Sequence, residues 1–284
     1  MIPQTSMKHF KFVGNLESVA YLLKGLVRFT PPHELNDPSE LQPLFDSIQV
    51  RESLANLRTK GYSEADLASL QEQGALLMKL DPRSMAVKPP TTLGEANKLV
   101  QAPFYDQTEH LEELLTSTVQ SMSGKVGVFC LTRTTDSLPM WAHYAGIARG
   151  AIVQFDGLAE EFPGDETGIL HQLRDVEYFP RRPSVTFQPA SHQHLFFSKL
   201  ADWSYERESR VVMALSDCEQ GQNNSGEKLY LYQLKQARAS RVILGWNLEA
   251  AEIQDWVSKW KVICPDIEIN VSTFRADTIS FDSL

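Results

Sequence analysis

The spacing of apolar residues divides the first third of the chain into two parts. Residues 8–13 (KHFKFV) and 26–30 (LVRFT) have the alternation and composition of short strands. Between them, residues 15–25 carry apolar side chains at helical spacing and close on a glycine. Pro31 and Pro32 then end the second strand. The chain is therefore predicted to open with a compact strand–helix–strand unit.

Residues 41–122 are predicted to be mostly helical. Apolar residues recur there at helical spacing in three stretches, 41–61, 63–80 and 108–122. Three prolines between residues 81 and 100 indicate a loop. None of these stretches holds a chemical motif, so we interpret the region as a helical insertion in the surrounding domain.

From residue 125 onward the pattern becomes that of short strands. Seven β-rich runs follow one another, with helices predicted at 136–149 and 247–260 and a polar hairpin connection at 218–228. The runs are 125–132, 150–156, 176–179, 209–215, 228–234, 240–245 and 267–274. Together with the opening unit they predict an α+β fold with a mixed or antiparallel central sheet. No linker is long enough to separate domains, so residues 1–284 are expected to form one domain.

Composition narrows the classes of function. The 284 residues have a formal net charge of −9, which disfavours a broad basic footprint for duplex nucleic acid. The three cysteines are widely spaced and odd in number, which fits a reducing compartment better than a disulfide framework. No stretch of about 18 apolar residues occurs and the N-terminus lacks an apolar signal core. We therefore expect a cytoplasmic location and no membrane partner.

The stretch 198–213 (SKLADWSYERESRVVM) offers the most informative charge pattern. On a strand, Glu206, Glu208 and Arg210 would share one face, and the apolar residues that follow would anchor the strand in a core. A carboxylate held at the rim of a cleft can orient a sugar hydroxyl, stabilise a developing cation or act as a base. Two structural interpretations stand beside this one: an edge strand blunted by charge, or an internal ion-pair network.

The segment MWAHYA (140–145) places Trp141, His143 and Tyr144 within one helical turn. Trp141 and Tyr144 could form a stacking wall for a nicotinamide or a base, with His143 as a donor. A buried histidine bonded to backbone is the alternative. Arg149 stands at a strand entrance, where it suits a phosphate or a structural ion pair equally.

The turn HELNDPSE (33–40) contributes Asn36 and Asp37 as candidate binding residues, although Asx turns explain both side chains without a ligand. The metal-ligand spacings HExxH and CxxC are absent, so no metal is expected. The chain also lacks GxxxxGK[ST], GxGxxG and GxSxG, the motifs of phosphate-loop nucleotidases, Rossmann dehydrogenases and α/β-hydrolases.

Four segments in combination resemble a bacterial family known as the domain of unknown function 2971. They are HFKF with LVRFTPPHELNDPSE, FCLTRTTDSLPMWAHYA with RGAIVQFD, VEYFP, and FSKLADWSYERESRVV with SRVILG. The match spans nearly the whole chain outside the helical 41–122 region. The chain departs from the family at Leu35 and Ser39, where an aromatic residue is common.

The order strand, helix, short strand and late glutamate strand is also similar to the ADP-ribosyltransferase fold. That resemblance implies that His9 or Lys11 on the first strand and the hydroxyl of Thr30 on the second hold NAD. It implies that Glu206 or Glu208 is the late catalytic carboxylate. The sequence ERE has the Glu-x-Glu form of members that modify arginine, whereas the Ser-Thr-Ser form of the fold is absent.

The resemblance suggests a role for each candidate. Glu208 would bond the ribose hydroxyls, Glu206 would position or deprotonate the nucleophile, and Trp141 or Tyr144 would stack on the nicotinamide. Arg28 or Arg149 would contact the pyrophosphate. The catalytic candidates are then Glu208, Glu206 and His143, and the NAD-binding candidates are His9, Lys11, Arg28, Thr30, Asn36, Asp37, Trp141, Tyr144 and Arg149.

These expectations favour an NAD-consuming enzyme, either an ADP-ribosyltransferase or an NAD glycohydrolase. NAD would be the substrate, the acceptor a protein or nucleic acid, and a toxin or anti-phage effector with an antitoxin or immunity partner would fit this chemistry. A non-catalytic binding or scaffold protein is one alternative. A nuclease-type nucleic-acid modifier using His143 with Glu206 and Glu208 is another.

Overall fold

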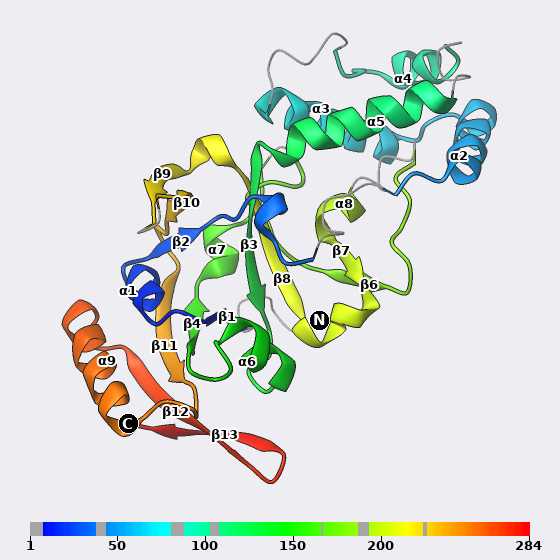
Figure 1. Cartoon of the computed structure of the whole chain (residues 1–284). Coiled ribbons are helices and arrows are strands. Elements are labelled where there is room, and N and C mark those ends of the chain that lie inside the picture. The colour runs from blue at the N-terminus through cyan, green and yellow to red at the C-terminus, as the bar shows by residue number, and fades with distance from the viewer. Residues whose placement is uncertain are drawn as a thin grey trace.

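A computed structural model describes residues 8–37, 44–80, 88–102, 108–165, 167–186, 193–223 and 226–284. Among these residues the main sheet has eight strands, and neighbouring strands are antiparallel except β11 and β12, which α9 (Ala250–Ile263) connects (Figure 1). In spatial order they are β13 (Thr278–Ser283), β12 (Glu268–Arg275), β11 (Arg238–Leu244), β4 (Ala151–Asp156), β1 (His9–Val13), β3 (Val126–Thr132), β8 (Glu208–Ala214) and β5 (Leu173–Asp175). The predicted α+β fold with a mixed sheet is confirmed.

Two small sheets flank the main one. The first consists of β2 (Leu26–Arg28), β10 (Lys228–Gln233) and β9 (Glu219–Gln222), all antiparallel. The second pairs β6 (Glu177–Phe179) with β7 (Ser198–Leu200) in parallel. Strand β9 lies within residues 218–228, which the sequence predicts to be a polar hairpin connection. The sequence did not predict this strand because its residues pair only with β10.

The predicted opening unit forms as β1, α1 (Glu17–Leu23) and β2. Asn15 lies two residues before the helix, and its side chain accepts a hydrogen bond from the backbone N–H of Glu17 at 2.9 Å. Strand β1 lies in the middle of the main sheet, whereas β2 joins β10 in the small sheet. Thr30, just beyond β2, exchanges two backbone hydrogen bonds of 2.9 Å with Val128 of β3. This bridge brings the end of the opening unit back to the main sheet.

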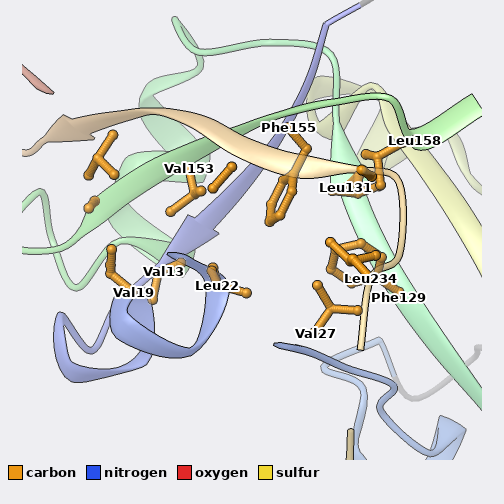
Figure 2. Packing of buried hydrophobic residues seen from close by; sticks show 14 of the residues in the cluster. Val13, Val19, Leu22, Val27, Phe129, Leu131, Val153, Phe155, Leu158 and Leu234 are labelled. Carbon is orange, nitrogen blue, oxygen red and sulfur yellow. The ribbon is translucent and has the colours of Figure 1, made fainter. Parts of the chain in front are cut away.

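The larger hydrophobic core lies on one face of the main sheet, and Figure 2 shows side chains of α1, β1, β3 and β4 gathered there. Val19, Phe129 and Phe155 are almost fully buried in it, together with Trp260 of α9. The short helix α7 (Leu158–Glu161) contributes Leu158. Because successive strand residues point to opposite faces, residues such as Phe12 and Val128 belong to the other face.

That second face carries two separate clusters. One holds Phe10 and Phe12 against α6 (Leu138–Tyr144). The other joins Val126 and Val128 to α8 (Gln193–Phe197) and to Leu76 of α3 (Glu64–Leu80). The surface between the two clusters is the region that matters for the candidate site.

The helical insertion consists of α2 (Ser47–Lys60), α3, α4 (Leu93–Val100) and α5 (Thr108–Ser123), which gather at one end of the sheet (Figure 1). The prediction of a loop throughout 81–100 is wrong for its last part. Thr92 starts α4 by accepting a hydrogen bond from the backbone N–H of Glu95 at 3.2 Å, so the helix begins just past the prolines. No helix in the described part of the chain has the length and apolar character needed to span a bilayer.

Candidate functional site

A pocket of about 580 Å³, counted out to its mouth, opens between the two clusters of the second face. Its floor comes from β1, β3 and β8, and its walls from α6, β7, the 3₁₀ helix Ala201–Glu206 and the residues after the 3₁₀ helix Pro32–Glu34. The lining residues are Phe10, Lys11, Phe12, Thr30, Leu35, Asn36, Cys130, Leu131, Thr132, Met140, Tyr144, Lys199, Glu206 and Glu208.

The pocket forms where β1 and β3 pair least. The two strands share a single register pair, Phe10 with Thr132, whereas β1 and β4 pair along five residues. Lys11 contacts the neighbouring strand, where its Nζ donates to the carbonyl of Cys130 at 2.9 Å. The weak pairing leaves room at the floor for polar side chains.

The two glutamates reach this pocket by a route different from the predicted one. Glu206 ends the 3₁₀ helix and Glu208 begins β8, so the expectation that they alternate along one strand is wrong. Arg207 between them has a left-handed conformation with φ 43°. The hydroxyl of Thr132 donates to the Glu206 carbonyl, and the N–H of Arg133 donates to the Arg207 carbonyl at 3.1 Å. These bonds fix the turn that directs both carboxylates into the pocket.

Glu208 is held by two cations. Arg210 forms a bidentate pair with it, at 2.6 Å from Nε to Oε1 and 2.8 Å from Nη2 to Oε2, and Lys199 Nζ lies 3.4 Å from Oε2. Burial raises the pKa of the Glu208 carboxyl, but the charges of Arg210 and Lys199 outweigh it and lower the pKa to about 2. Arg210 is itself 1% exposed and also donates to the Phe196 carbonyl at 3.1 Å. Glu208 is therefore a fully ionised, paired carboxylate.

Glu206 has a different environment. Its Oε2 accepts from Lys199 Nζ at 2.7 Å, and its Oε1 accepts from the Tyr144 hydroxyl at 2.6 Å. Asn36 in turn donates to the Tyr144 oxygen. Burial raises the pKa of Glu206 above its ordinary value, although Lys199 and Tyr144 act in the opposite direction. Burial and the adjacent Glu206 charge also raise the pKa of Tyr144, so this hydroxyl keeps its proton.

Backbone contacts support the network from outside. The hydroxyl of Tyr178 accepts a hydrogen bond from the backbone N–H of Glu208 at 2.8 Å, and burial raises the pKa of Tyr178 to about 12. Lys199 also lies 4.8 Å from the centre of the Trp203 ring. Lys199 is 4% exposed and its ammonium contacts both glutamates, so it balances two negative charges at once.

Lys199 is a site residue that the sequence did not predict. The residue stands alone in SKL, and no spacing rule relates it to the two glutamates. Only the parallel pairing of β7 with β6 and the following 3₁₀ helix bring its ammonium beside them. The interpretation of Glu206, Glu208 and Arg210 as an internal ion-pair network is confirmed for Glu208 and Arg210.

Six of the predicted site residues line this one pocket: Lys11, Thr30, Asn36, Tyr144, Glu206 and Glu208. Three distant parts of the chain, near residues 30, 144 and 207, therefore converge. The structure also places a cysteine among them, because Cys130 is the partly exposed residue of an otherwise buried β3.

The other two candidates of the MWAHYA segment lie elsewhere. Trp141 is 1% exposed, packs against Phe12 and Trp246, and donates from Nε1 to the Thr135 carbonyl at 2.8 Å. It is a core residue and does not form a wall of the pocket. His143 lies on the exposed side of α6, outside the pocket lining. One turn of helix thus presents its three aromatic side chains to three different environments.

The two arginines expected at a pyrophosphate form ion pairs away from the pocket. Arg149 contacts both carboxylate oxygens of Glu252 in α9, at 2.8 and 2.9 Å, and Arg28 pairs with Glu34. Of the structural alternatives offered by sequence, the ion pair is the one observed for Arg149.

His9 and Asp37 are buried and line no part of this pocket. His9 contributes instead to a second pocket, on the opposite face of the sheet. Residues 38–40 of the NDPSE turn lie outside the described residues. Within the described part of the chain no group of three or more histidine, cysteine, aspartate or glutamate side chains is placed to hold a metal ion.

Comparisons of this chain with protein-family models, curated proteins and solved structures found no match. The resemblances to the domain of unknown function 2971 and to the ADP-ribosyltransferase fold therefore stay predictions.

Proposed function

We propose that the pocket binds NAD and that the protein cleaves the bond between nicotinamide and ribose, as an ADP-ribosyltransferase or NAD glycohydrolase. The observation that carries the proposal is Glu206: a buried carboxylate of raised pKa, bonded to Tyr144 and Lys199, at the wall of the pocket.

The polar groups around the pocket suit the nicotinamide–ribose half of the substrate. The hydroxyl of Thr30 and the amide of Asn36 can bond ribose hydroxyls, and the ring of Tyr144 offers an aromatic surface for the nicotinamide. Lys11 supplies a positive charge in the pocket lining for phosphate oxygens. The apolar residues Phe10, Leu35 and Met140 complete a lining of mixed character.

The chemistry requires three events. The C1′–N bond breaks as nicotinamide leaves with the bonding electrons, which gives the ribose oxocarbenium character. The Glu206 carboxylate stabilises that positive charge. Water or an acceptor group then adds to C1′ and passes its proton to Glu206, whose raised pKa makes it a better base than an ordinary carboxylate.

Glu208 acts in this proposal as a positioning residue. Both of its oxygens are already paired with Arg210, and its pKa is far below neutrality, so it is a poor base. Its role is to hold Lys199 against Glu206. This division differs from the sequence-based expectation, which gave Glu208 the ribose hydroxyls.

The same ion pairs favour the alternative of a non-catalytic binding protein, in which the whole network serves stability. The Glu206→Gln variant separates the two. Purified protein is incubated with NAD labelled in the adenylate, with and without cell lysate, and nicotinamide release and label transfer are measured. Glu252→Gln, which changes a surface ion pair of α9, is the matched control.

We expect wild type and Glu252→Gln to consume NAD at similar rates. Glu206→Gln should lose about 100-fold or more of the activity, the size expected for an acid–base residue, while thermal unfolding shows that it remains folded. An absence of nicotinamide release and label transfer in wild type, together with no NAD binding by calorimetry, would overturn the proposal.

A further inference from the structure

The second pocket lies on the opposite face of the sheet from the proposed NAD site and has no part in that chemistry. It measures about 770 Å³ out to its mouth. Its lining comes from the first residue of β1, the end of β3, the segment around α7 and strand β5. The lining residues are His9, Arg133, Ala159, Phe162, Pro163, Gln172, Leu173, Arg174 and Asp175.

Basic and donor groups dominate the polar lining. Arg133, Gln172 and the 5%-exposed His9 line the pocket together with one carboxylate, that of Asp175. The guanidinium of Arg174 lies on the other face of the sheet, where it donates to Gln193 at 2.9 Å and contacts the ring of Phe197. Arg133 is therefore the group of this wall that suits a negative ligand.

Arg133 is the residue with capacity to bind such a ligand. Its Nη2 pairs with Asp175, whereas its Nε is buried and has no hydrogen-bond partner among the described residues. A guanidinium can form five hydrogen bonds in a fixed fork, so most of its capacity is unused. Asp175 does not depend on Arg133 alone for hydrogen bonds, because its other carboxylate oxygen accepts from the Ser209 hydroxyl at 2.8 Å.

We infer that this second pocket is a binding site for a small oxyanion of the phosphoryl type, with Arg133 as its principal contact. Asp175 holds the Arg133 guanidinium and competes with the ligand for it. This competition distinguishes a ligand site from a structural ion pair. Substitution of Arg133 should weaken binding of the oxyanion, whereas substitution of Asp175 should strengthen it.

The experiment measures binding of inorganic phosphate by calorimetry at neutral pH, to wild type and to the variants Arg133→Gln, Asp175→Asn and Glu206→Gln. Glycerol 3-phosphate replaces phosphate in a second arm, which distinguishes free phosphate from a phosphate ester. Acetate is the comparison for charge without the phosphoryl group. Circular dichroism confirms the fold of each variant.

We expect wild type to bind one phosphate, Arg133→Gln to bind it about tenfold more weakly or worse, and Asp175→Asn to bind it more tightly. Arg133→Lys, which keeps the charge without the fork, should be intermediate and serves if Arg133→Gln fails to fold. Binding of glycerol 3-phosphate as well as phosphate would support a site that accepts esters.

Binding should survive Glu206→Gln unchanged, so the outcome does not depend on the fate of the proposed enzyme. No phosphate binding in wild type, equal binding of acetate, or weaker binding in Asp175→Asn would overturn the inference.

Discussion

Four charged side chains of the candidate site lie within one buried network, and their charges cancel. Glu206 and Glu208 face Lys199 and Arg210, each at most 5% exposed. Removing one partner from such a network leaves an uncompensated buried charge, which is more costly than the net contribution of the pair. The two glutamates nevertheless differ, because their neighbours shift their pKa values in opposite directions. Opposed pKa shifts in neighbouring carboxyls are a common sign of divided roles at functional sites.

Tyr144→Phe tests the role of Glu206 through its pKa. The Tyr144 hydroxyl stabilises the ionised carboxylate, so its removal should raise the Glu206 pKa further. A hydrogen bond to a charged group contributes about 1.5–3 kcal/mol, or roughly 1–2 pH units. We expect the acid limb of the kcat/KM profile for NAD cleavage to move to higher pH by that amount. Tyr205→Phe, one residue from Glu206 in the 3₁₀ helix, is the control and should leave the limb in place.

Glu208→Gln tests the structural role of the other glutamate. Its ordinary pKa is 4.5 and its folded value about 2, so its stabilising effect is complete above pH 4.5 and is lost as the pH falls toward 2. The shift corresponds to on the order of 3 kcal/mol. Urea unfolding of wild type should therefore weaken across that window, whereas Glu208→Gln should start about 3–5 kcal/mol less stable at neutral pH and show a flatter dependence. An unchanged midpoint at pH 7 would show that the pair with Arg210 contributes little.

At the scale of elements, local pattern predicted most of the helices and strands. The strand–helix–strand opening, α6, α9 and the long strands β3, β4, β8, β11 and β12 all coincide with predicted runs. These elements have strong local signals, either alternation in strands or a cap and apolar spacing in helices. Strands β5, β7, β9 and β13 have three to six residues and gain their identity from a neighbour, so local pattern could not find them.

The candidate site was predictable in part for the same reason. Thr30, Tyr144 and Glu208 sit at element ends that sequence identified, and their convergence follows from the order of strands in the sheet. The path from Glu206 to Glu208 depends on the left-handed Arg207, and the position of Lys199 depends on a short parallel pair. Neither has a local signature, because an arginine seldom adopts positive φ and a three-residue strand has no usable period.

At the scale of the whole molecule, the helical insertion divides into two parts. Leu76 and Leu80 of α3 belong to the core cluster formed by β3, β8 and α8, and Lys79 pairs with Asp165 at 2.9 Å. Helices α2 and α4 instead share a small cluster of their own, formed by Leu54, Leu57 and Val100. Helix α3 thus shares a core cluster with the main sheet, whereas the cluster of α2 and α4 is separate from it.

This difference predicts how the molecule unfolds. Leu76 is 3% exposed, so Leu76→Ala should lower the global free energy of unfolding by about 2–5 kcal/mol, the usual effect of truncating a buried leucine. Leu57 is 6% exposed, but Leu57→Ala should chiefly increase local opening of α2 and α4. Native-state hydrogen exchange measures both: faster exchange in the β3 and β8 amides is expected for Leu76→Ala, and faster exchange confined to α2 and α4 for Leu57→Ala. Equal acceleration in both regions by either variant would mean that the insertion and the sheet unfold as a single cooperative unit.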